Sequence, residues 1–504
     1  MINRLDLDVF RRIERFLWAA VLVALPVTSF RYLPFMGGDT QVKPLSLIPA
    51  VLLLLALLLR SLRERRLVLW NNGFQPLLVF ILVAAAASAA GFLLTPVNLY
   101  SYTYPSRMIR AWLSLGVGLI FLITSVCMSR DEQDLKFTIK WIYVGLVFEM
   151  VWSLVQLFEI FIYPFPALDA LQKTVMMAGL PTNNRISGLA LEPSWLAAQV
   201  ITLYLPWALA AVLKNYDIGI PRKWVAAILA SCLFLLVFTY SRGGILITLI
   251  AVGLTCILAG LDSLQRAWKW FISPLKPKNF PSLKAVDVGL RIIVLTAILV
   301  SVGGGAFILS RNQYFAKLWQ SNNASITDYF VNISAGPRLA YSWAGWTTFS
   351  QHPWTGVGMG AAGLYLIQAL PDWAHVNILE TALLLSPENQ TYPNPHSLYI
   401  RLLSETGIFG FWSFIAFYLL VLGKILFGLR SKRKELIFLG TASLMAWLSI
   451  VMLGITLASF AMPIIWVPLG ILIGISTAEK KSQIPRTPDK TSITAAINGG
   501  GDAA

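Results

Sequence analysis

Charged residues are scarce in this chain of 504 residues: Asp, Glu, Lys and Arg make up 13% of it, whereas hydrophobic residues make up 57%. A soluble domain has roughly 25% charged and about 45–50% apolar residues. Apolar runs of about 20 residues recur along the chain, each long enough to cross a bilayer as a helix. The sequence therefore excludes a soluble globular protein. It predicts an all-α polytopic membrane protein. In lipid the backbone N–H and C=O groups of such a run must bond to one another, and a helix satisfies them all within one segment.

Cysteine and histidine are also scarce, with three of each. Cys127, Cys232 and Cys256 lie inside apolar runs, which favours small core residues over disulfides or metal ligands. No carboxylate pair or His/Asp/Glu cluster with metal-ligand spacing falls on the outer side of the expected topology. We therefore expect neither a metal nor another cofactor.

The apolar runs predict twelve membrane spans, at about residues 16–35, 44–61, 74–95, 108–128, 137–162, 194–213, 223–240, 244–261, 288–309, 397–423, 435–456 and 459–477. With the N-terminus inside, the inner loops and tail hold 28 of the 40 Lys and Arg residues and the outer loops hold 11. This positive-inside distribution predicts that both termini are cytoplasmic in a cytoplasmic membrane. The net charge of +16 is scattered over separate loops without a binding motif, which argues against a nucleic-acid partner.

One membrane domain is predicted over residues 1–476, with a long outer loop at residues 311–396 inserted between spans 9 and 10. Structureless loops of this length are uncommon, so we expect the loop to contain short helices, one of them over residues 372–385, and to have a function. The polar tail at residues 477–504 is expected to be disordered. No cleavable signal peptide is expected, since residues 1–15 are charged and no clear cleavage site follows.

A single histidine lies where one of these spans meets the outside. Asn394, Pro395 and His396 form a polar approach, and the chain stays apolar from Ser397 to Leu422. An imidazole at such a helix mouth can carry out proton chemistry near neutral pH. The alternative is that His396 only caps the helix or lies among lipid headgroups.

Two arginines occupy outer positions where a simple loop does not need them. Arg242 lies in a tight turn between two spans. Its guanidinium either points into the bundle toward a phosphate or extends to the water at the membrane interface. Arg338 follows Pro337, where a helix is expected to begin. It would then lie in the first turn, whose free backbone donors favour an anion, or else be a solvated loop arginine.

Two further pairs of charged residues lie on the outer side. Arg185 and Glu192 flank the entry to the sixth span, where Glu192 is either an ordinary charge at a helix N-terminus or a group that holds a sugar hydroxyl or orients His396. Arg401 and Glu405 are four residues apart on the tenth span and point away from His396, so we expect a structural ion pair.

The segment Gly356-Val-Gly-Met-Gly360 resembles a phosphate loop only superficially. It follows no recognisable strand and lies outside, so a turn is expected.

The candidate residues are far apart in the sequence, yet all of them map to the outer side. They are His396, Arg242, Arg338, Arg185 and Glu192. A candidate base together with several arginines suggests chemistry on a polyanionic, lipid-linked substrate.

At this point the chain resembles the O-antigen ligase and polymerase superfamily, bacterial polytopic glycosyltransferases of the GT-C type. The resemblance covers most of the chain and is strongest from Arg185 onward. It is carried by the Arg185 loop running to Glu192-Pro-Ser-Trp-Leu-Ala, Tyr240-Ser-Arg-Gly-Gly, Arg338 with Trp343, His352-Pro-Trp-Thr-Gly-Val-Gly-Met-Gly360, Pro395-His-Ser-Leu-Tyr, and Glu405-Thr-Gly-Ile-Phe-Gly410.

The resemblance implies an inverting, metal-independent glycosyltransferase at the periplasmic face of the bacterial inner membrane. The donor would be a glycan on undecaprenyl pyrophosphate. His396 would match the essential histidine of the family, and Arg242 and Arg338 would match arginines that bind pyrophosphate. The long loop would grip the acceptor glycan, with Trp343, Trp346 and Trp354 as candidate stacking faces. Packing or interfacial anchoring is the alternative role for these tryptophans.

The acceptor stays open at this stage: lipid A–core for a ligase, a growing glycan for a polymerase, or a protein side chain for an oligosaccharyltransferase. A secondary transporter, for example of inorganic carbon, is the alternative from another class. A transporter should have charged or broken segments near the midplane of several spans, whereas the distinctive residues here collect at the outer surface.

Overall fold

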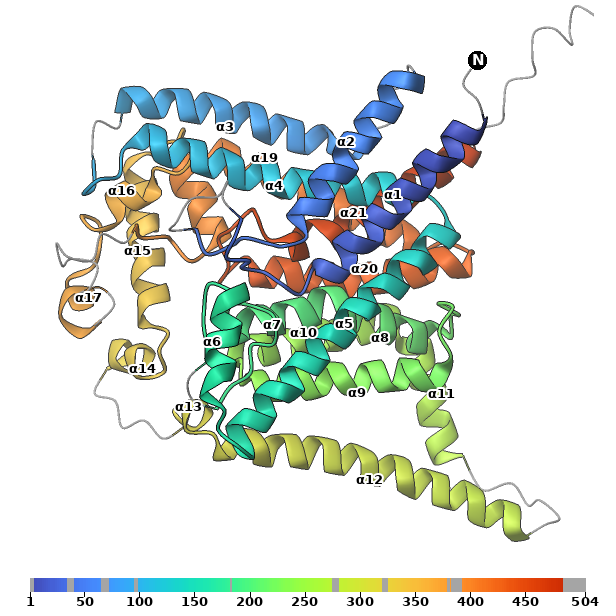
Figure 1. Ribbon diagram of the computed structural model, residues 1–504. Coiled ribbons are helices and arrows are strands. Elements are labelled where there is room, and N and C mark those ends of the chain that lie inside the picture. The colour runs from blue at the N-terminus through green and yellow to red at the C-terminus, as the bar shows by residue number, and fades with distance from the viewer. Residues whose placement is uncertain are drawn as a thin grey trace, which may run out of the picture.

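The computed structural model consists of helices that run mostly side by side in one bundle (Figure 1). It describes residues 4–33, 40–64, 72–94, 98–181, 184–273, 281–319, 325–378, 381 and 392–483. The described residues form no β-strand, only three isolated bridges. The all-helical fold class is therefore confirmed.

Within the described ranges, eight helices are long and apolar enough to cross a membrane. They are α3 (Gln75–Leu94), α4 (Tyr104–Met128), α5 (Glu132–Phe161), the continuous helix of α7 (Pro193–Gln199), η3 (Val200–Tyr204) and α8 (Leu205–Lys214), α9 (Arg222–Thr239), α10 (Arg242–Ala259), α19 (Leu398–Leu429) and α20 (Lys434–Leu453). The other four predicted spans overlap α1 (Arg4–Ala24), α2 (Leu47–Glu64), α12 (Pro281–Arg311) and α21 (Pro463–Gln483). Each predicted span therefore overlaps a helix, and eight of these helices meet the length and hydropathy that a span needs, so the count of twelve spans stays a prediction.

The largest difference from the predicted spans lies at the first one. The helix α1 begins at Arg4 and ends at Ala24, whereas the span was predicted at about residues 16–35. Within α1, Glu14 forms a buried ion pair with Arg60 of α2, which joins the two helices. Pro26 follows the end of α1, and a proline has no backbone N–H with which to continue a helix.

At the other end of the chain, α21 continues to Gln483, so residues 477–483 are helical rather than part of the predicted tail. The remainder of that tail, residues 484–504, lies outside the described residues.

The continuous helix formed by α7, η3 and α8 lies at the centre of the bundle. Of the residues in its apolar stretch, 89% are buried. Its middle, η3, is a π-helical turn. Trp207 in α8 is fully buried, as are Trp18 of α1 and Trp466 of α21, which form part of the surrounding core. The helix that begins just after Glu192 is therefore anchored in the core of the bundle.

The tenth predicted span is broken near its beginning. Gly407 in α19 has φ 64° and ψ −167°, which interrupts the helical hydrogen bonds. The segment from Pro353 to Gly358 fills the break, because Val357 N donates to Ser404 O and Gly358 N donates to Glu405 O, both at 2.9 Å. These bonds satisfy backbone groups that would otherwise be orphaned inside the bundle.

This geometry also explains the glycine-rich segment 356–360. Gly356, Gly358 and Gly360 all have positive φ, so the segment is a series of turns, as predicted. It packs against the backbone of α19 and is not the phosphate loop that its sequence superficially resembles.

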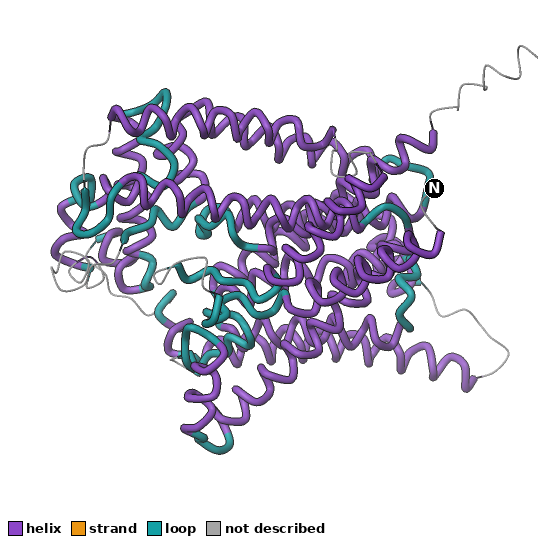
Figure 2. Tube along the Cα trace, turned by 45° about the horizontal axis from the view of Figure 1, so that its top comes forward, coloured by secondary structure: helices purple, strands orange, loops and turns teal. Residues whose placement is uncertain are grey.

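In the part of residues 312–397 that the structure describes, five short helices lie between α12 and α19 and gather at one end of the bundle (Figure 1). They are α13 (Gln313–Ala316), α14 (Ile326–Asn332), α15 (Gly336–Gln351), α16 (Ala362–Leu366) and α17 (Asp372–Asn377). The predicted outer loop therefore contains helices of its own, and α17 covers the first part of the helix expected at residues 372–385. Figure 2 shows loop segments gathered toward this end, opposite the marked N-terminus.

Gly356→Ala is expected to lower the stability of the protein. An added Cβ would lie 2.5 Å from the carbonyl carbon of Glu405, and the residue would keep φ at 64°. The expected loss is about 1–3 kcal/mol, the usual cost of a strained backbone conformation. It would be measured as a lower thermal unfolding midpoint in detergent.

Gly253→Ala in α10 is the matched control, since no neighbouring atom lies within 4 Å of the added Cβ. Equal unfolding midpoints for the two variants would contradict the role assigned to the 353–358 segment.

Candidate functional site

A cavity of about 1410 Å³ lies where the short helices meet the bundle. Its lining includes Arg185, Glu192, Arg242, Arg338 and His396. The structure therefore brings together the five residues that the sequence placed on one face, although they come from four separate segments of the chain.

Arg242 is the first residue of α10 and is aimed by a tight turn. Tyr240 has φ 46°, and Ser241 caps the helix by accepting a hydrogen bond from Gly244 N. The Arg242 Nη1 atom donates to Ile333 O at 2.6 Å. Its Nε and Nη2 atoms are buried and have no hydrogen-bond partner among the described residues. Two buried guanidinium donors whose hydrogen bonds are not satisfied among the described residues suit the oxygens of a phosphate.

Arg185 lies beside Arg242 against the same aromatic ring. The guanidinium carbons of Arg185 and Arg242 lie 4.6 and 4.0 Å from the centre of the Tyr314 ring. Arg185 Nε also donates to Thr239 O at 2.9 Å. Burial lowers the pKa of Arg185, and the charges of Arg242 and Arg338 lower it further. Arg242 and Arg338 are therefore close enough to Arg185 to disfavour its charge, a cost that a bound anion would offset.

The loop that carries Arg185 is fixed from within the bundle. The side-chain oxygen Oε1 of Gln156 in α5 accepts from Ser187 N at 3.0 Å and from Gly188 N at 2.9 Å. About two turns earlier in α5, Glu149 accepts from Leu189 N at 3.0 Å. A loop whose backbone donors are satisfied by buried side chains is rigid, so Arg185 and Glu192 have defined positions.

Arg338 lies in the first turn of α15, which begins at Gly336 with Pro337 in the first positions, as predicted. The free N–H groups of a helix start add to the positive charge of the guanidinium. Ser334, just before the helix, has φ 60° and also lines the cavity.

His396 is held in an uncommon backbone conformation immediately before α19. Its φ is 56°, and its N–H donates to Asn394 Oδ1 at 3.2 Å. The imidazole stacks on Tyr341, with ring centres 5.2 Å apart and planes 13° apart. Burial lowers the pKa of His396 to about 4, with a further contribution from the charge of Arg338. The imidazole is therefore neutral at pH 7 and can accept a hydrogen bond from a hydroxyl.

Glu192 lines the cavity, where its carboxylate accepts from Ser194 Oγ at 3.0 Å. It also lies close enough to Arg185 to raise the pKa of that guanidinium. Glu192 and His396 share the cavity without a hydrogen bond between them, so the arrangement favours a contact with substrate over orientation of the histidine.

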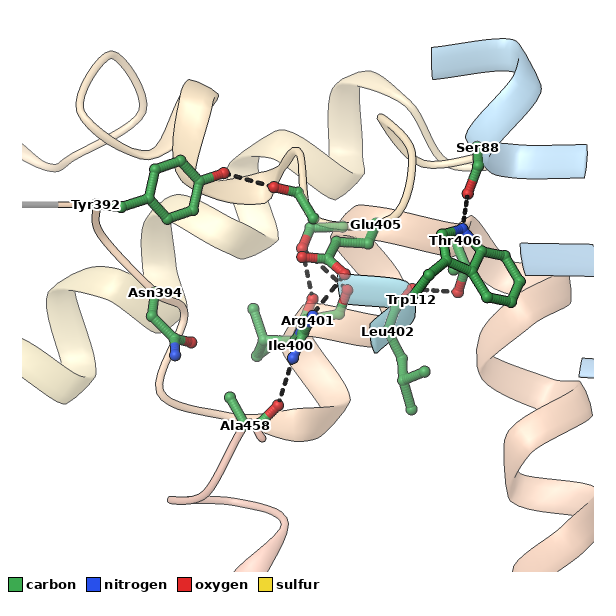
Figure 3. Close-up of polar contacts among 12 residues, drawn as sticks. Ser88, Trp112, Tyr392, Asn394, Ile400, Arg401, Leu402, Glu405, Thr406 and Ala458 are labelled. Carbon is green, nitrogen blue, oxygen red and sulfur yellow. Dashed lines mark hydrogen bonds and ion pairs between the residues drawn. The ribbon is translucent and has the colours of Figure 1, made fainter. Parts of the chain in front are cut away.

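Arg401 and Glu405 form the predicted ion pair, with Nε and Oε2 3.0 Å apart (Figure 3). Arg401 also donates to Ala458 O at 2.8 Å. Both residues line the cavity, but each satisfies the charge of the other.

The predicted tryptophans lie outside the cavity lining. Trp343 is 57% exposed, Trp346 is 50% exposed and Trp354 is 66% exposed. Trp354 packs on Phe409 of α19 with ring centres 5.9 Å apart. Their role in gripping a glycan stays a prediction, and it would apply to a part of the glycan outside the cavity.

Several residues that shape the site were not predicted from the sequence. Tyr314 and Tyr341 support the arginines and the histidine, but an isolated tyrosine in a loop or helix gives no signal of this. Gln156 and Glu149 hold the Arg185 loop, and a carboxylate inside an apolar run is a signal that could have identified Glu149.

Strained backbone is concentrated around the cavity. Of the six residues other than glycine that have positive φ in the described chain, four lie at the site: Asn184, Tyr240, Ser334 and His396. Such conformations cost roughly 1–3 kcal/mol each and persist where the surrounding structure enforces them, often at functional sites.

One protein-family model matches part of the chain. Residues 226–415 match the family model described as O-antigen ligase. The match covers 190 of the 504 residues and supports the resemblance of the chain to the O-antigen ligase and polymerase superfamily. The matched region contains Arg242, Arg338 and His396, whereas Arg185 and Glu192 precede it. No curated protein matches the chain.

The His396 imidazole is expected to titrate well below an ordinary histidine. In a variant with His352→Gln and His375→Gln, an isotope-labelled histidine would give one NMR signal, with a midpoint near 4 rather than near 6.5. Arg338→Gln should raise the midpoint, because it removes a nearby positive charge that disfavours the imidazolium. A midpoint near 6.5 in the parent protein would show that His396 is solvated.

Proposed function

We propose that the protein transfers a glycan from undecaprenyl pyrophosphate to an acceptor hydroxyl at the periplasmic face of the bacterial inner membrane. The observation that carries the proposal is the assembly of Arg185, Arg242 and Arg338 with the neutral imidazole of His396 in one cavity. A cluster of guanidinium groups is the arrangement expected for a pyrophosphate, and a neutral imidazole beside it can receive a proton.

The reaction in this site is a single displacement. The acceptor oxygen attacks the anomeric carbon as the bond from that carbon to the pyrophosphate oxygen breaks, which inverts the configuration. Negative charge develops on the leaving lipid pyrophosphate, where Arg242 and Arg338 stabilise it. The guanidinium groups thereby supply the positive charge that the leaving group requires, which supports a metal-independent mechanism.

His396 receives the proton of the acceptor hydroxyl during the attack. In the empty cavity its low pKa makes it a weak base, partly because Arg338 is nearby. A bound pyrophosphate would offset the charge of Arg338 and raise the basicity of His396. The base would thus become stronger when the donor is in place.

We propose lipid A–core as the acceptor, the reaction of an O-antigen ligase. A growing glycan or a protein side chain would use the same donor site and the same base, so these acceptors are the alternatives. The contacts of Arg242 and His396 support the donor and the chemistry in each case.

Arg242→Ala and Arg338→Ala should each lower the rate of glycan transfer by about 10²–10³-fold, the usual effect of removing one preorganised charge donor. Lysine at either position should rescue poorly, because a point charge does not reproduce the bidentate fork. The measurement is transfer by purified protein from a synthetic undecaprenyl-pyrophosphate glycan.

Arg31→Ala is the control for these variants. Arg31 is an exposed arginine whose guanidinium donates to Lys173 O, and it does not line the cavity. Wild-type activity in Arg242→Ala would remove that residue from the pyrophosphate site.

His396→Ala should stop transfer while the donor still binds, because the arginines that would hold the pyrophosphate are unchanged. His352→Ala should be tolerated, since His352 ends α15 outside the cavity. Chelator should leave the wild-type rate unchanged. Normal turnover by His396→Ala, or loss of wild-type activity in chelator, would show that the proposed chemistry is wrong.

A further inference from the structure

A second pocket lies at the end of the bundle opposite the cavity described above. It has a volume of about 710 Å³ and lies where the end of α8 meets the beginnings of α11 (Leu261–Ile272) and α20. The helices α7 and α10 begin at the cavity, whereas α8 and α10 end at this pocket or beside it. Figure 1 shows α11 far from the short helices α14 to α17. The pocket therefore lies on the side where the distribution of Lys and Arg predicts the cytoplasm.

The second pocket is positively charged. Its lining contains three cationic side chains, Lys214, Arg266 and Lys434, each from a different helix. Among the residues that the structure describes, no Asp or Glu belongs to this lining. Lys434 is also the first residue of α20, and the N-terminal end of a helix adds positive charge of its own. An anionic group is the chemical complement of such a lining.

The acidic residues nearest in the sequence lie outside the lining. Asp262 is exposed in the first turn of α11, where a carboxylate complements the positive end of the helix. Glu435 forms an ion pair with Arg433, with Oε2 and Nη2 3.0 Å apart. The carboxylate of Asp217 accepts a hydrogen bond from Gly219 N at 2.8 Å. These carboxylates therefore do not take the place of an anion inside the pocket.

Two of the three cations are positioned by uncharged partners. Lys214 Nζ donates to Ala259 O at the end of α10. Arg266 Nη2 donates to Ser263 Oγ at 2.8 Å, and Ser263 Oγ in turn donates to Leu213 O. Because the acceptors are neutral oxygens, these bonds fix the side chains without neutralising them. They also join α11 to the ends of α8 and α10, so the pocket is formed before any ligand binds.

One face of α11 is apolar and exposed. No residue of this helix is buried, and Leu261, Leu264, Trp268 and Ile272 are 44% to 64% exposed. At 100° per residue these four lie within an arc of about 80°, and Arg266 lies about 160° from Trp268 on the other side of the helix. A short helix with tryptophan and leucine on one face and a cation on the other is typical of the membrane interface.

The orientation of α11 suits a position in that interface. Figure 1 shows it running across the direction of α9 rather than along it. Its C-terminal end is fixed by Arg291 of α12, whose Nη1 atom donates to Phe271 O and to Ser273 O, both at 2.9 Å. The helix is therefore held at both ends while its apolar face stays exposed.

The second pocket and this apolar face are continuous. Leu264 lies on the face and also lines the pocket, together with Val212, Leu213 and Ala267. The lining therefore combines three cations with hydrocarbon. A ligand that matches both parts has an anionic group joined to an apolar chain, which is the chemistry of an anionic membrane lipid.

We propose that the second pocket binds the phosphate group of an anionic glycerophospholipid, with an acyl chain along the apolar face of α11. A soluble phosphate compound would contact the cations without covering Leu264 and Trp268. The site is separate from the glycan transfer proposed above. The bound lipid would join α8, α11 and α20 at the predicted cytoplasmic side.

Thermal unfolding of the purified full-length protein in a neutral detergent tests the site. Dioleoyl phosphatidylglycerol should raise the unfolding midpoint by several degrees relative to the same amount of dioleoyl phosphatidylcholine, because a ligand of the folded state stabilises it. Arg266→Gln and Lys434→Gln should each lose most of this difference. Lys269→Gln is the matched control, since it removes one charge from the same helix outside the pocket lining and should retain the difference.

Three results would overturn the proposal. They are equal midpoints with the two lipids in wild type, an undiminished difference in Arg266→Gln and Lys434→Gln, and a loss in Lys269→Gln as large as in those two variants. Inorganic phosphate at the same concentration should give no rise, and a rise equal to that with phosphatidylglycerol would show that the ligand is a soluble anion. Lys434 is exposed, so Lys434→Gln keeps the test decisive if Arg266→Gln does not fold.

Brominated acyl chains test the apolar part of the site, because bromine quenches the fluorescence of a tryptophan that it touches. Brominated phosphatidylglycerol should quench wild type more than brominated phosphatidylcholine does. This excess should disappear in Trp268→Phe and persist in Trp343→Phe, which replaces an exposed tryptophan of α15 near the other end of the bundle. An unchanged excess in Trp268→Phe would overturn the position proposed for the acyl chain.

Discussion

Three guanidinium groups of like charge share one partly buried cavity, and the rest of the site depends on that fact. Burial disfavours the charged form of Arg185, and the nearby charges of Arg242 and Arg338 disfavour it further. The arrangement persists because two backbone carbonyls accept from Arg185 and Arg242 and the Tyr314 ring lies against both. The protein therefore holds the positive charge ready before any ligand binds, which is the arrangement that stabilises charge developing in a transition state.

The same charge couples the base to the donor. His396 is neutral because it is buried and because Arg338 is near, so an anion that offsets Arg338 should strengthen the base.

Local patterns in the sequence predicted much of this. The helix start at Pro337, the Arg401–Glu405 pair and the turns at residues 356–360 each follow from neighbouring residues. The contacts of Tyr314 and of Gln156 could not be predicted, because they join segments that only the folded bundle brings together. The positive-φ conformation of His396 was equally hidden, since it depends on Tyr341 and on the start of α19.

The most direct test is the titration of His396 with and without the lipid-linked donor, followed by NMR in the variant that has only this histidine. The account predicts a midpoint near 4 in the empty protein and a clear rise when the donor binds, because its pyrophosphate would neutralise Arg338. A donor that binds tightly without moving the midpoint would contradict the claim that the pyrophosphate lies beside the base.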